Sequence, residues 1–281
     1  MKVQTSHAQE NALSMEYSTS ASSCAILISS CDAYADLWRP YFTLFERYWA
    51  DCPFPVYLVS NERACTNKRV VTLPVGNRGN WSDEIREALQ TLATPYVLLT
   101  LEDFFLRRPV STDKVLSCLD FLQQQNGHML RMIPRPAPDA SLARFPWVGQ
   151  VFPGAPYRVS TQATIWHRQT LLELIREGET IWEFELNGSR RSDSFEGFYS
   201  VWEAVLPYDH HVVERGKWFR NEAQYFGRMD VGCDFSRRPI MTRREMLRWY
   251  LHMVKGVLLG FIPWPQRLRL VHWLKRFRRM A

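Results

Sequence analysis

The segment Tyr96-Val-Leu-Leu-Thr-Leu-Glu-Asp-Phe-Phe-Leu106 is an apolar run that ends directly in two consecutive carboxylates, Glu102 and Asp103. A short apolar run of this kind is typical of a parallel strand that is buried on both faces. We therefore predict a strand at 96–101 with two acidic side chains at its carboxyl end. These acids would hold a divalent cation, or they would cap the following turn or pair with the neighbouring arginines.

Similar apolar runs precede this strand and alternate with segments of helical spacing. The run from Cys24 to Ser30 ends in small polar residues, and 36–49 then carries apolar side chains at helical intervals. This alternation predicts an α/β domain, with a mixed, mostly parallel sheet, flanking helices and a ligand site at the carboxyl ends of the strands. Residues 134–156 are rich in proline and are expected to form an ordered loop. The predicted strands are 24–30, 56–60, 70–74, 96–101, 129–133 and 157–166, and the predicted helices are 36–49, 82–92, 112–124 and 167–177.

The distribution of charge divides the chain into parts. The 281 residues carry a net charge of +6, but residues 241–281 hold ten Lys or Arg and a single acid, Glu245, so the preceding part is slightly acidic. A protein that reads nucleic acid carries its basic residues on the recognition domain, so we expect no nucleic-acid partner. We predict a flexible N-terminus at 1–22, the main domain at 23–240 and a basic helical extension at 241–281.

The spacing of the cysteines and the hydropathy of the sequence indicate the cellular compartment in which we expect the protein. The 6 cysteines form no CxxC pair and have no zinc-like spacing with histidine, which indicates reduced thiols. The first 23 residues lack the basic and apolar regions of a secretion signal, and no apolar stretch approaches the roughly 20 residues of a membrane span. We therefore expect a cytoplasmic protein whose membrane contact is at most peripheral.

Two common phosphate-binding motifs are missing from the sequence. There is neither a GxxxxGK[ST] loop nor a GxGxxG after the first predicted strand, which disfavours a P-loop NTPase and a standard dinucleotide dehydrogenase. Any bound phosphate must then be held by a cation on the acids or by basic side chains, although solvation at the surface is the simpler interpretation of each basic residue. The basic candidates are Arg131, Arg135, Arg158, Arg168 and Lys217.

Three segments taken together resemble the nucleotide-sugar glycosyltransferases of the GT-A fold: Ser29-Ser30-Cys31-Asp32, Gly79-Asn80-Trp81-Ser82 and Glu102-Asp103. The likeness covers roughly residues 24–218 and is closest to transferases of bacterial surface-polysaccharide clusters. It implies a UDP- or GDP-sugar donor, with Asp32 on the base and the acidic pair in the place of the family's DxD motif. The residues implied to lie at the nucleotide are Ser30, Asp32, Trp81, Ser82, Glu102 and Asp103.

The resemblance also implies Mg²⁺ or Mn²⁺ between the acidic motif and the diphosphate. Phe104 stands where the family motif has a second acid, so Asp103 is the expected metal ligand. Enzymes of this family often supply a late histidine to the metal, and His211 is the candidate, with an ordinary surface histidine as the alternative. Lys217 is expected to reach a phosphate as a point charge.

The segment 180–191 combines two carboxylates with a tryptophan, directly after Gly178. Sugar transfer with inversion needs a carboxylate that takes the proton from the acceptor hydroxyl, and Glu183 or Glu185 is the candidate base. In an extended segment these two share one side and Trp182 lies on the other, whereas a helix would change this grouping. The alternative is a half-exposed strand with a solvated acidic side. The predicted acceptor-binding residues are Gln162, Trp166 and Trp182.

The C-terminal residues look like two helices separated by Pro263-Trp-Pro265. The last helix, predicted at 266–280, places apolar side chains on one side and basic side chains on the other. Such a helix docks on anionic membranes through its charges and its apolar side. The alternative is a helix packed on the domain with a solvated basic side.

These patterns lead to one functional hypothesis. The chain would transfer a sugar from a nucleotide-sugar donor to a glycan or lipid-linked acceptor in bacterial surface-polysaccharide synthesis, at the cytoplasmic face of the inner membrane. The chief alternative is a non-catalytic glycan- or partner-binding protein of the same fold. A metal phosphohydrolase using Glu102 and Asp103 is a more distant alternative, because it would need further acids or histidines at the same place.

Overall fold

The computed structural model describes residues 23–260, with side chains as far as Leu251. Within this range the chain divides into two compact units, residues 23–211 with 231–233 and residues 212–230 with 234–260. The predicted start of the extension at 241 therefore falls inside the second unit. The predicted flexible N-terminus (1–22) and the predicted last helix (266–280) lie outside the described residues.

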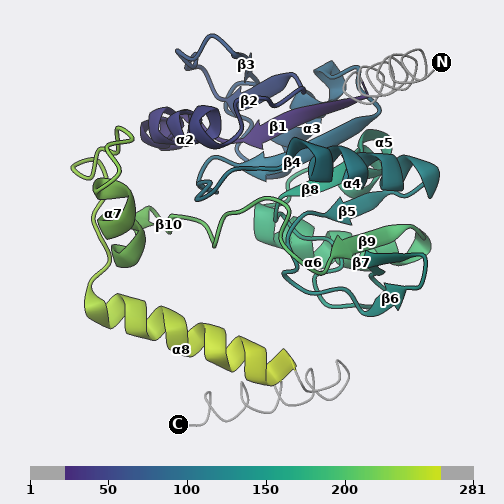
Figure 1. Cartoon of the computed structure of the whole chain (residues 1–281). Helices are drawn as coiled ribbons and strands as arrows, with labels where there is room; N and C mark the ends of the chain where they lie inside the picture. Colours follow the sequence, from purple (N-terminus) through teal and green to yellow (C-terminus); the bar gives the residue numbers. More distant parts are fainter. Residues whose placement is uncertain (1–22, 261–281) are drawn as a thin grey trace, which may run out of the picture. The chain divides into compact units, whose positions relative to one another are not determined.

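In the described chain, nine strands form one sheet in the order β3-β2-β1-β4-β8-β5-β9-β7-β6 (Figure 1). The pairs β1 with β2, β1 with β4, β2 with β3 and β5 with β9 are parallel. Only β7 and β8 run opposite to the other strands of this sheet, and each is antiparallel to both of its neighbours. The sheet is mixed and mostly parallel, which confirms the predicted fold class. Its strands are β1 (Cys24–Ser29), β2 (Val56–Ser60), β3 (Val70–Pro74), β4 (Tyr96–Leu101), β5 (Met129–Arg131), β6 (Ala140–Leu142), β7 (Phe145–Gln150), β8 (Thr164–His167) and β9 (Phe198–Val201).

Helices cover both faces of this sheet (Figure 1). On one face α3 packs against α5 and α6, and one apolar cluster joins Leu27 of β1 to Ile85 of α3 and Phe184 of α6. Successive strand residues point to opposite faces, so Ile26 meets Tyr41 of α2 on the other face. The helices of this unit are α2 (Ala35–Tyr48), α3 (Trp81–Thr91), α4 (Thr112–Gln124), α5 (Arg168–Leu174) and α6 (Ile181–Arg191), with the short η1 (Asp32–Tyr34) and η2 (Ser192–Ser194).

Several predicted elements agree with the structure residue for residue. The strands predicted at 56–60, 70–74 and 96–101 are β2, β3 and β4, and the helix predicted at 112–124 is α4. These segments have a regular apolar period, which is a local property of the chain. The helix α3 begins at Trp81 after the N-cap Asn80, one residue before the predicted start.

One loop prediction and one strand prediction, in adjacent segments, were wrong. The Pro-rich segment 134–156 contains β6 and β7, and Pro146 falls at the irregular register between these strands, where a missing N–H costs least. The strand predicted at 157–166 begins only at Thr164, because Tyr157 takes a positive φ of 53° and the residues after it turn. The segment 157–163 is therefore a connection that runs to the sheet edge.

The second unit is small and contains its own apolar cluster. It consists of the hairpin β10 (Val213–Glu214) and β11 (Lys217–Trp218), followed by α7 (Arg220–Gly227) and α8 (Arg243–Gly260). Phe219, Met241 and Met246 are buried together, with Trp249 packed against them. The helix α8 is the first of the two helices predicted within 241–281, and the extension as a domain stays a prediction.

Candidate active site

The carboxyl edge of the sheet brings the predicted donor-side segments together. β1 and β4 pair in parallel with Ser29 opposite Leu101, so the chain leaves both strands at the same level. β2 lies on one side of β1 and β4 lies on the other, which makes this edge a topological switch point. Open α/β sheets bind ligands at such a point, outside the carboxyl ends of the strands. Ser30 and Asp32 therefore lie at the same edge as Glu102 and Asp103.

Two tryptophans bond to the hydroxyls at the end of β1. Nε1 of Trp38 donates to Oγ of Ser30 (2.8 Å), and Nε1 of Trp81 donates to Oγ of Ser29 (2.9 Å). Ser30 is only 8% exposed, so its hydroxyl is used inside the protein. Trp81 is half-buried at this edge, and its ring lies 5.0 Å from that of Phe184, which connects α3 with α6. A nucleotide contact of Trp81 stays a prediction.

Asp32 organises the turn that follows β2. Its carboxylate accepts hydrogen bonds from the backbone N–H groups of Asn61 (3.0 Å), Glu62 (3.2 Å) and Arg63 (3.2 Å). In return, Oδ1 of Asn61 accepts from the backbone N–H of Asp32 at 3.0 Å. A base bound by Asp32 would therefore have to share this carboxylate with three backbone donors. The sequence carried no signal for this pairing, because Asn61 belongs to a different loop.

The side chain of Ser82 connects two segments inside the protein. It is completely buried, its Oγ accepts from the backbone N–H of Glu179 (2.9 Å), and its own N–H donates to the Glu179 carbonyl (3.1 Å). These bonds join the first turn of α3 to the chain that enters α6. The side chain has no exposed surface and is used inside the protein, and the nucleotide role of Ser82 stays a prediction.

Glu102 and Asp103 are turned inward. Each is only 8% exposed, so neither side chain points into bulk solvent. Burial, and then the negative charge of Glu102, raises the pKa of the Cys31 thiol, which places Glu102 near the end of β1. Burial is also the main cause of the raised pKa of Tyr208, to which the charge of Asp103 adds. The two carboxylates thus lie in a largely desolvated and negatively charged place, where a diphosphate would need a counter-cation.

The described residues do not form a metal site by themselves. Among residues 23–251, no three side chains of His, Cys, Asp or Glu gather in a way that could hold a metal ion. The predicted ligand Asp103 therefore lacks the further protein ligands that a site made of protein alone requires. His211 follows Tyr208 in the chain, and its carbonyl accepts a hydrogen bond from Nδ1 of His210 at 2.6 Å. A metal-binding role of His211 stays a prediction.

The segment 180–191, for which the sequence left an extended segment and a helix open, contains the helix α6, and this decides how its acids are grouped. Thr180 and Glu183 form a capping box, in which each side chain bonds to the other residue's backbone N–H. These hydrogen bonds from Thr180 lower the pKa of Glu183. Residues two apart on a helix point about 200° away from each other, so Glu183 and Glu185 do not share a side. Thr180 is the N-cap of α6, and Glu183 completes its capping box.

Glu185 is held against the carboxyl edge. Its Oε1 accepts from both the backbone N–H (2.7 Å) and the hydroxyl (2.8 Å) of Thr161, which lies just before β8. Because β8 runs antiparallel to β4, with Thr164 opposite Leu99, the residues before β8 lie at the end of β4 where Glu102 begins. Burial raises the pKa of Glu185, although the Thr161 hydrogen bonds and the charge of Arg131 oppose the shift. A carboxylate in this environment is suited to taking up a proton.

Tyr208 joins the acidic segment to the predicted acceptor residue Gln162. Its ring stacks on Phe104, next to Asp103, with centroids 4.4 Å apart. Its hydroxyl accepts from the backbone N–H of Ala163 (2.9 Å) and donates to Oε1 of Gln162 (3.2 Å). Sequence reasoning did not select Tyr208 or Thr161, because no local pattern indicates contacts between such distant segments.

The buried arginines support the backbone. Arg131 is completely buried and donates to the carbonyls of Pro136 (2.6 Å), Tyr157 (2.8 Å) and Arg158 (3.0 Å) and to Oγ of Ser160 (3.0 Å). Arg158 is 1% exposed and donates to the carbonyls of Val151, Ser192 and Phe195. Arg168 donates to the carbonyls of Thr94 and Leu89. These bonds engage three of the phosphate candidates, and a phosphate contact of the exposed Arg135 stays a prediction.

The two predicted acceptor tryptophans have opposite environments. Trp166 is completely buried in the main apolar cluster, with its ring 5.9 Å from that of Phe198. The ring has no exposed surface on which a sugar could stack, and the acceptor role of Trp166 stays a prediction. Trp182 is 67% exposed on the first turn of α6, and its acceptor role stays a prediction.

Lys217 belongs to the second unit. Its Nζ bonds to Oε1 of Glu245 at 2.5 Å, so the ammonium group already has an anionic partner within that unit. The phosphate contact predicted for Lys217 would have to replace this ion pair.

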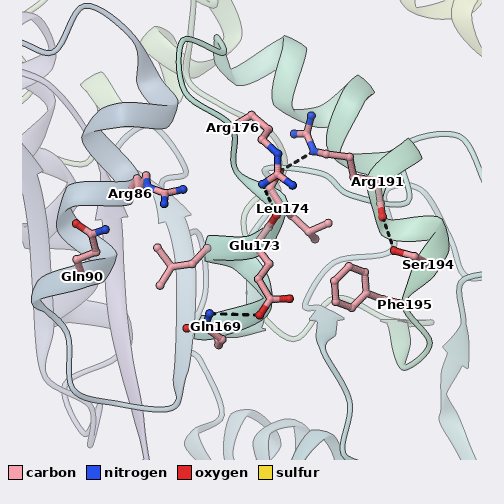
Figure 2. A pocket seen from close by; sticks show the side chains of 10 residues that line it. Arg86, Gln90, Gln169, Glu173, Leu174, Arg176, Arg191, Ser194 and Phe195 are labelled. Carbon is pink, nitrogen blue, oxygen red and sulfur yellow. Dashed lines mark hydrogen bonds between the residues drawn. The ribbon is translucent and has the colours of Figure 1, made fainter.

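A pocket of about 740 Å³ lies along α3, α5 and the end of α6 (Figure 2). Its wall carries Arg86, Arg176 and Arg191, but no predicted site residue. Arg191 is bound by Glu179 at 2.6 Å, and Arg176 donates to the carbonyl of Glu173. The pocket therefore does not coincide with the carboxyl edge, and two of its arginines are engaged by neighbouring groups.

Comparison with known proteins limits what the fold implies. No family model matches the chain, and no curated protein matches it. The solved structures that it resembles include nucleotide-sugar glycosyltransferases. One is a mannosyltransferase from Pyrobaculum calidifontis in complex with GDP-Man and Mn²⁺, at 12% identity, TM-score 0.47 and coverage of 69% of this chain and 58% of that chain.

Two further structures have comparable similarity. Glucosyl-3-phosphoglycerate synthase from Mycobacterium tuberculosis, with Mn²⁺ and UDP-glucose, has 12% identity, TM-score 0.45 and coverage of 82% and 84%. A 2-C-methyl-D-erythritol 4-phosphate cytidylyltransferase from Thermus thermophilus has 14% identity, TM-score 0.43 and coverage of 73% and 97%. These proteins have names that indicate different reactions. A similarity at this level therefore describes the fold and leaves the reaction open.

Proposed function

We propose that the carboxyl edge of the sheet in the first unit transfers a sugar from a nucleotide-sugar donor to an acceptor hydroxyl. The observation that carries the proposal is the position of Glu185. Thr161 holds its carboxylate at the edge where β4 ends in Glu102 and Asp103. In this proposal, the base for the acceptor hydroxyl and the two acids on the donor side lie at the same edge of the sheet, although they are far apart in the sequence.

In the proposed reaction Glu185 accepts the proton of the acceptor hydroxyl as its oxygen attacks the anomeric carbon. The bond from that carbon to the diphosphate breaks, and the nucleoside diphosphate leaves with the electron pair. Burial favours the neutral form of Glu185 after proton uptake, which suits a base of this kind. Gln162, fixed by Tyr208, would bond to a sugar hydroxyl beside it.

The negative charge of the donor diphosphate must be neutralised where it meets the two acids at the end of β4. Asp103 and Glu102 would repel a diphosphate, so a divalent cation bound by Asp103 together with diphosphate oxygens is part of the proposal. The cation would neutralise the leaving group. We further propose a glycan or lipid-linked acceptor in bacterial surface-polysaccharide synthesis, where the enzyme works on the cytoplasmic side.

The test is donor binding followed by turnover. UDP-glucose and GDP-mannose are titrated into the full chain by calorimetry, with and without Mn²⁺, and release of the nucleoside diphosphate is then measured. We expect binding of one donor that depends on the cation, followed by slow hydrolysis. Absence of binding for these and other UDP- and GDP-sugars, with Mg²⁺ or with Mn²⁺, would contradict the proposal.

A non-catalytic protein that binds a glycan or a partner is the second candidate. It is favoured by the internal use of Ser30 and Asp32, whose side chains bond to Trp38 and to backbone groups. Binding of a sugar nucleotide or glycan without turnover, in every acceptor mixture tried, would support this candidate over the transferase.

A further inference from the structure

The helix α8 in the second unit has one side that is packed and one side that is exposed. It begins with a capping box, because Thr242 and Glu245 exchange hydrogen bonds between side chain and backbone N–H (2.7 Å and 3.2 Å). On the packed side Met246 is 9% exposed, and the ring of Trp249 lies 4.8 Å from that of Phe219. This side is occupied by the unit's own apolar cluster.

The opposite side, which we call the outer face of α8, combines apolar and basic side chains. Leu247, Tyr250 and Leu251 are 59%, 47% and 60% exposed, and their spacing places them on one stripe. The exposed arginines of the same helix lie among and beside them: Arg243, Arg244 and Arg248. Exposed leucines at this spacing are unusual on a helix that faces only water.

The outer face carries positive charge that no acid of the helix offsets. Glu245 is the single acid of residues 241–281, which hold ten Lys or Arg. Its carboxylate is bound to Nζ of Lys217 at 2.5 Å and to Thr242, on the packed side. These hydrogen bonds, that of Lys217 first, lower the pKa of Glu245 to about 2. The acid is thus withdrawn from the outer face and stays ionised against Lys217.

We propose that the outer face of α8 binds to a membrane surface containing anionic phospholipids. The arginines would contact lipid phosphates, and Leu247, Tyr250 and Leu251 would enter the boundary between headgroups and acyl chains. No helix within the described residues has the length and apolar character to span a bilayer. This inference is independent of the reaction proposed for the first unit.

Charge favours lipid over a second copy of the chain. In a two-fold dimer through this face, the arginines of one copy would face the arginines of the other and repel them. The leucines favour lipid over nucleic acid, because a phosphate backbone offers them no apolar surface. The experiment below distinguishes a lipid surface from a second copy of the chain and from nucleic acid.

The experiment uses the full chain and sedimentation with vesicles of phosphatidylcholine alone or with 30% phosphatidylglycerol. One variant combines Arg243→Gln, Arg244→Gln and Arg248→Gln, and a second combines Leu247→Gln and Leu251→Gln. A control of equal charge change combines Arg47→Gln, Arg108→Gln and Arg144→Gln, which are exposed on the first unit. Circular dichroism and gel filtration show whether each variant keeps its fold and its oligomeric state.

We expect the wild type and the control to bind the anionic vesicles and not the neutral ones. At about 1 kcal/mol for each basic residue, loss of the three α8 arginines weakens the partition coefficient by about 100-fold. The leucine variant weakens binding to anionic vesicles at high salt as well, because its contribution is not screened.

Several results would overturn the proposal. The proposal fails if the wild type does not bind anionic vesicles, or if both α8 variants bind them as tightly as the wild type does. It also fails if the control variant loses as much vesicle binding as the α8 arginine variant. A wild-type dimer that the leucine variant dissociates would assign the face to a second copy. A single-stranded oligonucleotide at equimolar concentration is also added to the vesicle-bound protein. If it displaces the protein from the vesicles, and if the leucine variant binds the oligonucleotide as tightly as the wild type does, the face would be assigned to nucleic acid.

Discussion

Thr161 holds Glu185 through two hydrogen bonds to the same carboxylate oxygen, one from its backbone N–H at 2.7 Å and one from its hydroxyl at 2.8 Å. The two residues come from different elements, since Thr161 precedes β8 and Glu185 lies in α6. This contact fixes the orientation of a buried carboxylate at the carboxyl edge of the sheet.

The Glu185→Gln variant should bind the donor as the wild type does and lose turnover. Glutamine keeps the shape and the hydrogen-bond acceptor for Thr161, but it cannot take up a proton at this pH. In the wild type, turnover should rise with pH through the raised pKa of Glu185, above the usual range for Glu, because the ionised form is the base. Calorimetry and a pH profile of donor hydrolysis check both statements. Unchanged turnover in this variant would remove Glu185 from the mechanism.

The same carboxylate should affect stability with pH. A folded-state pKa raised above the unfolded value of about 4.5 means that the folded state binds more protons. The free energy of unfolding should therefore fall as pH rises from about 4.5 through the folded pKa. Urea unfolding of wild type and Glu185→Gln across this range should show that the fall is smaller in the variant. Parallel curves for the two proteins would indicate that Glu185 is not desolvated in solution.

The Thr161→Val variant should move the acid limb of the pH profile to higher pH. Loss of the hydroxyl removes a hydrogen bond that favours the ionised carboxylate, so the pKa of Glu185 should rise further. Thr161→Ser keeps the hydroxyl and is the matched control. An identical limb in the valine and serine variants would show that the hydroxyl does not tune Glu185.

The Asp103→Asn variant should abolish transfer and weaken donor binding in the presence of Mn²⁺. The amide preserves the shape but not the charge that a cation needs. Glu203→Gln, an exposed acid on the same unit, is the control and should behave as the wild type. Calorimetric donor titrations test this, and wild-type affinity in Asp103→Asn would place the diphosphate elsewhere.

Glu183→Gln should retain turnover, whereas Thr180→Ala should lower the free energy of unfolding by about 1 kcal/mol. Glutamine can serve in the capping box as glutamate does, and loss of an N-cap hydroxyl costs about this amount. Donor turnover and urea unfolding distinguish a cap from a base. Loss of turnover in a stably folded Glu183→Gln protein would restore Glu183 as the base.

The parts of the fold that were predictable from the sequence are those with local causes. The apolar runs of β2, β3 and β4 and the period of α4 carry their own signal, and their bounds agree with the structure. The helix α6 also had a local signal, because Thr180 and Glu183 stand at the spacing of a capping box. The alternation of acids and aromatics is also compatible with an extended segment, so the pattern left both structures open.

The roles of individual side chains depended on partners far along the chain. Ser82 and Trp166 are polar and aromatic residues of the kind that bind nucleotides and sugars, yet both are completely buried. Ser82 is used by Glu179, 97 residues away, and nothing near either residue in the sequence indicates that pairing. Arg131 is likewise used by carbonyls of the loop before β8.

The sequence by itself determined the elements with a regular apolar period, such as β2, β3, β4 and α4, and the two acids at the end of β4, because hydrophobic periodicity is local. Tertiary structure alone decided which polar groups remain at the carboxyl edge for a ligand. Buried donors and acceptors must find partners, and the chain brings those partners from distant segments. In this protein that requirement turned Ser82 and Arg131 into supports and left Glu185, held by Thr161, beside the acidic end of β4.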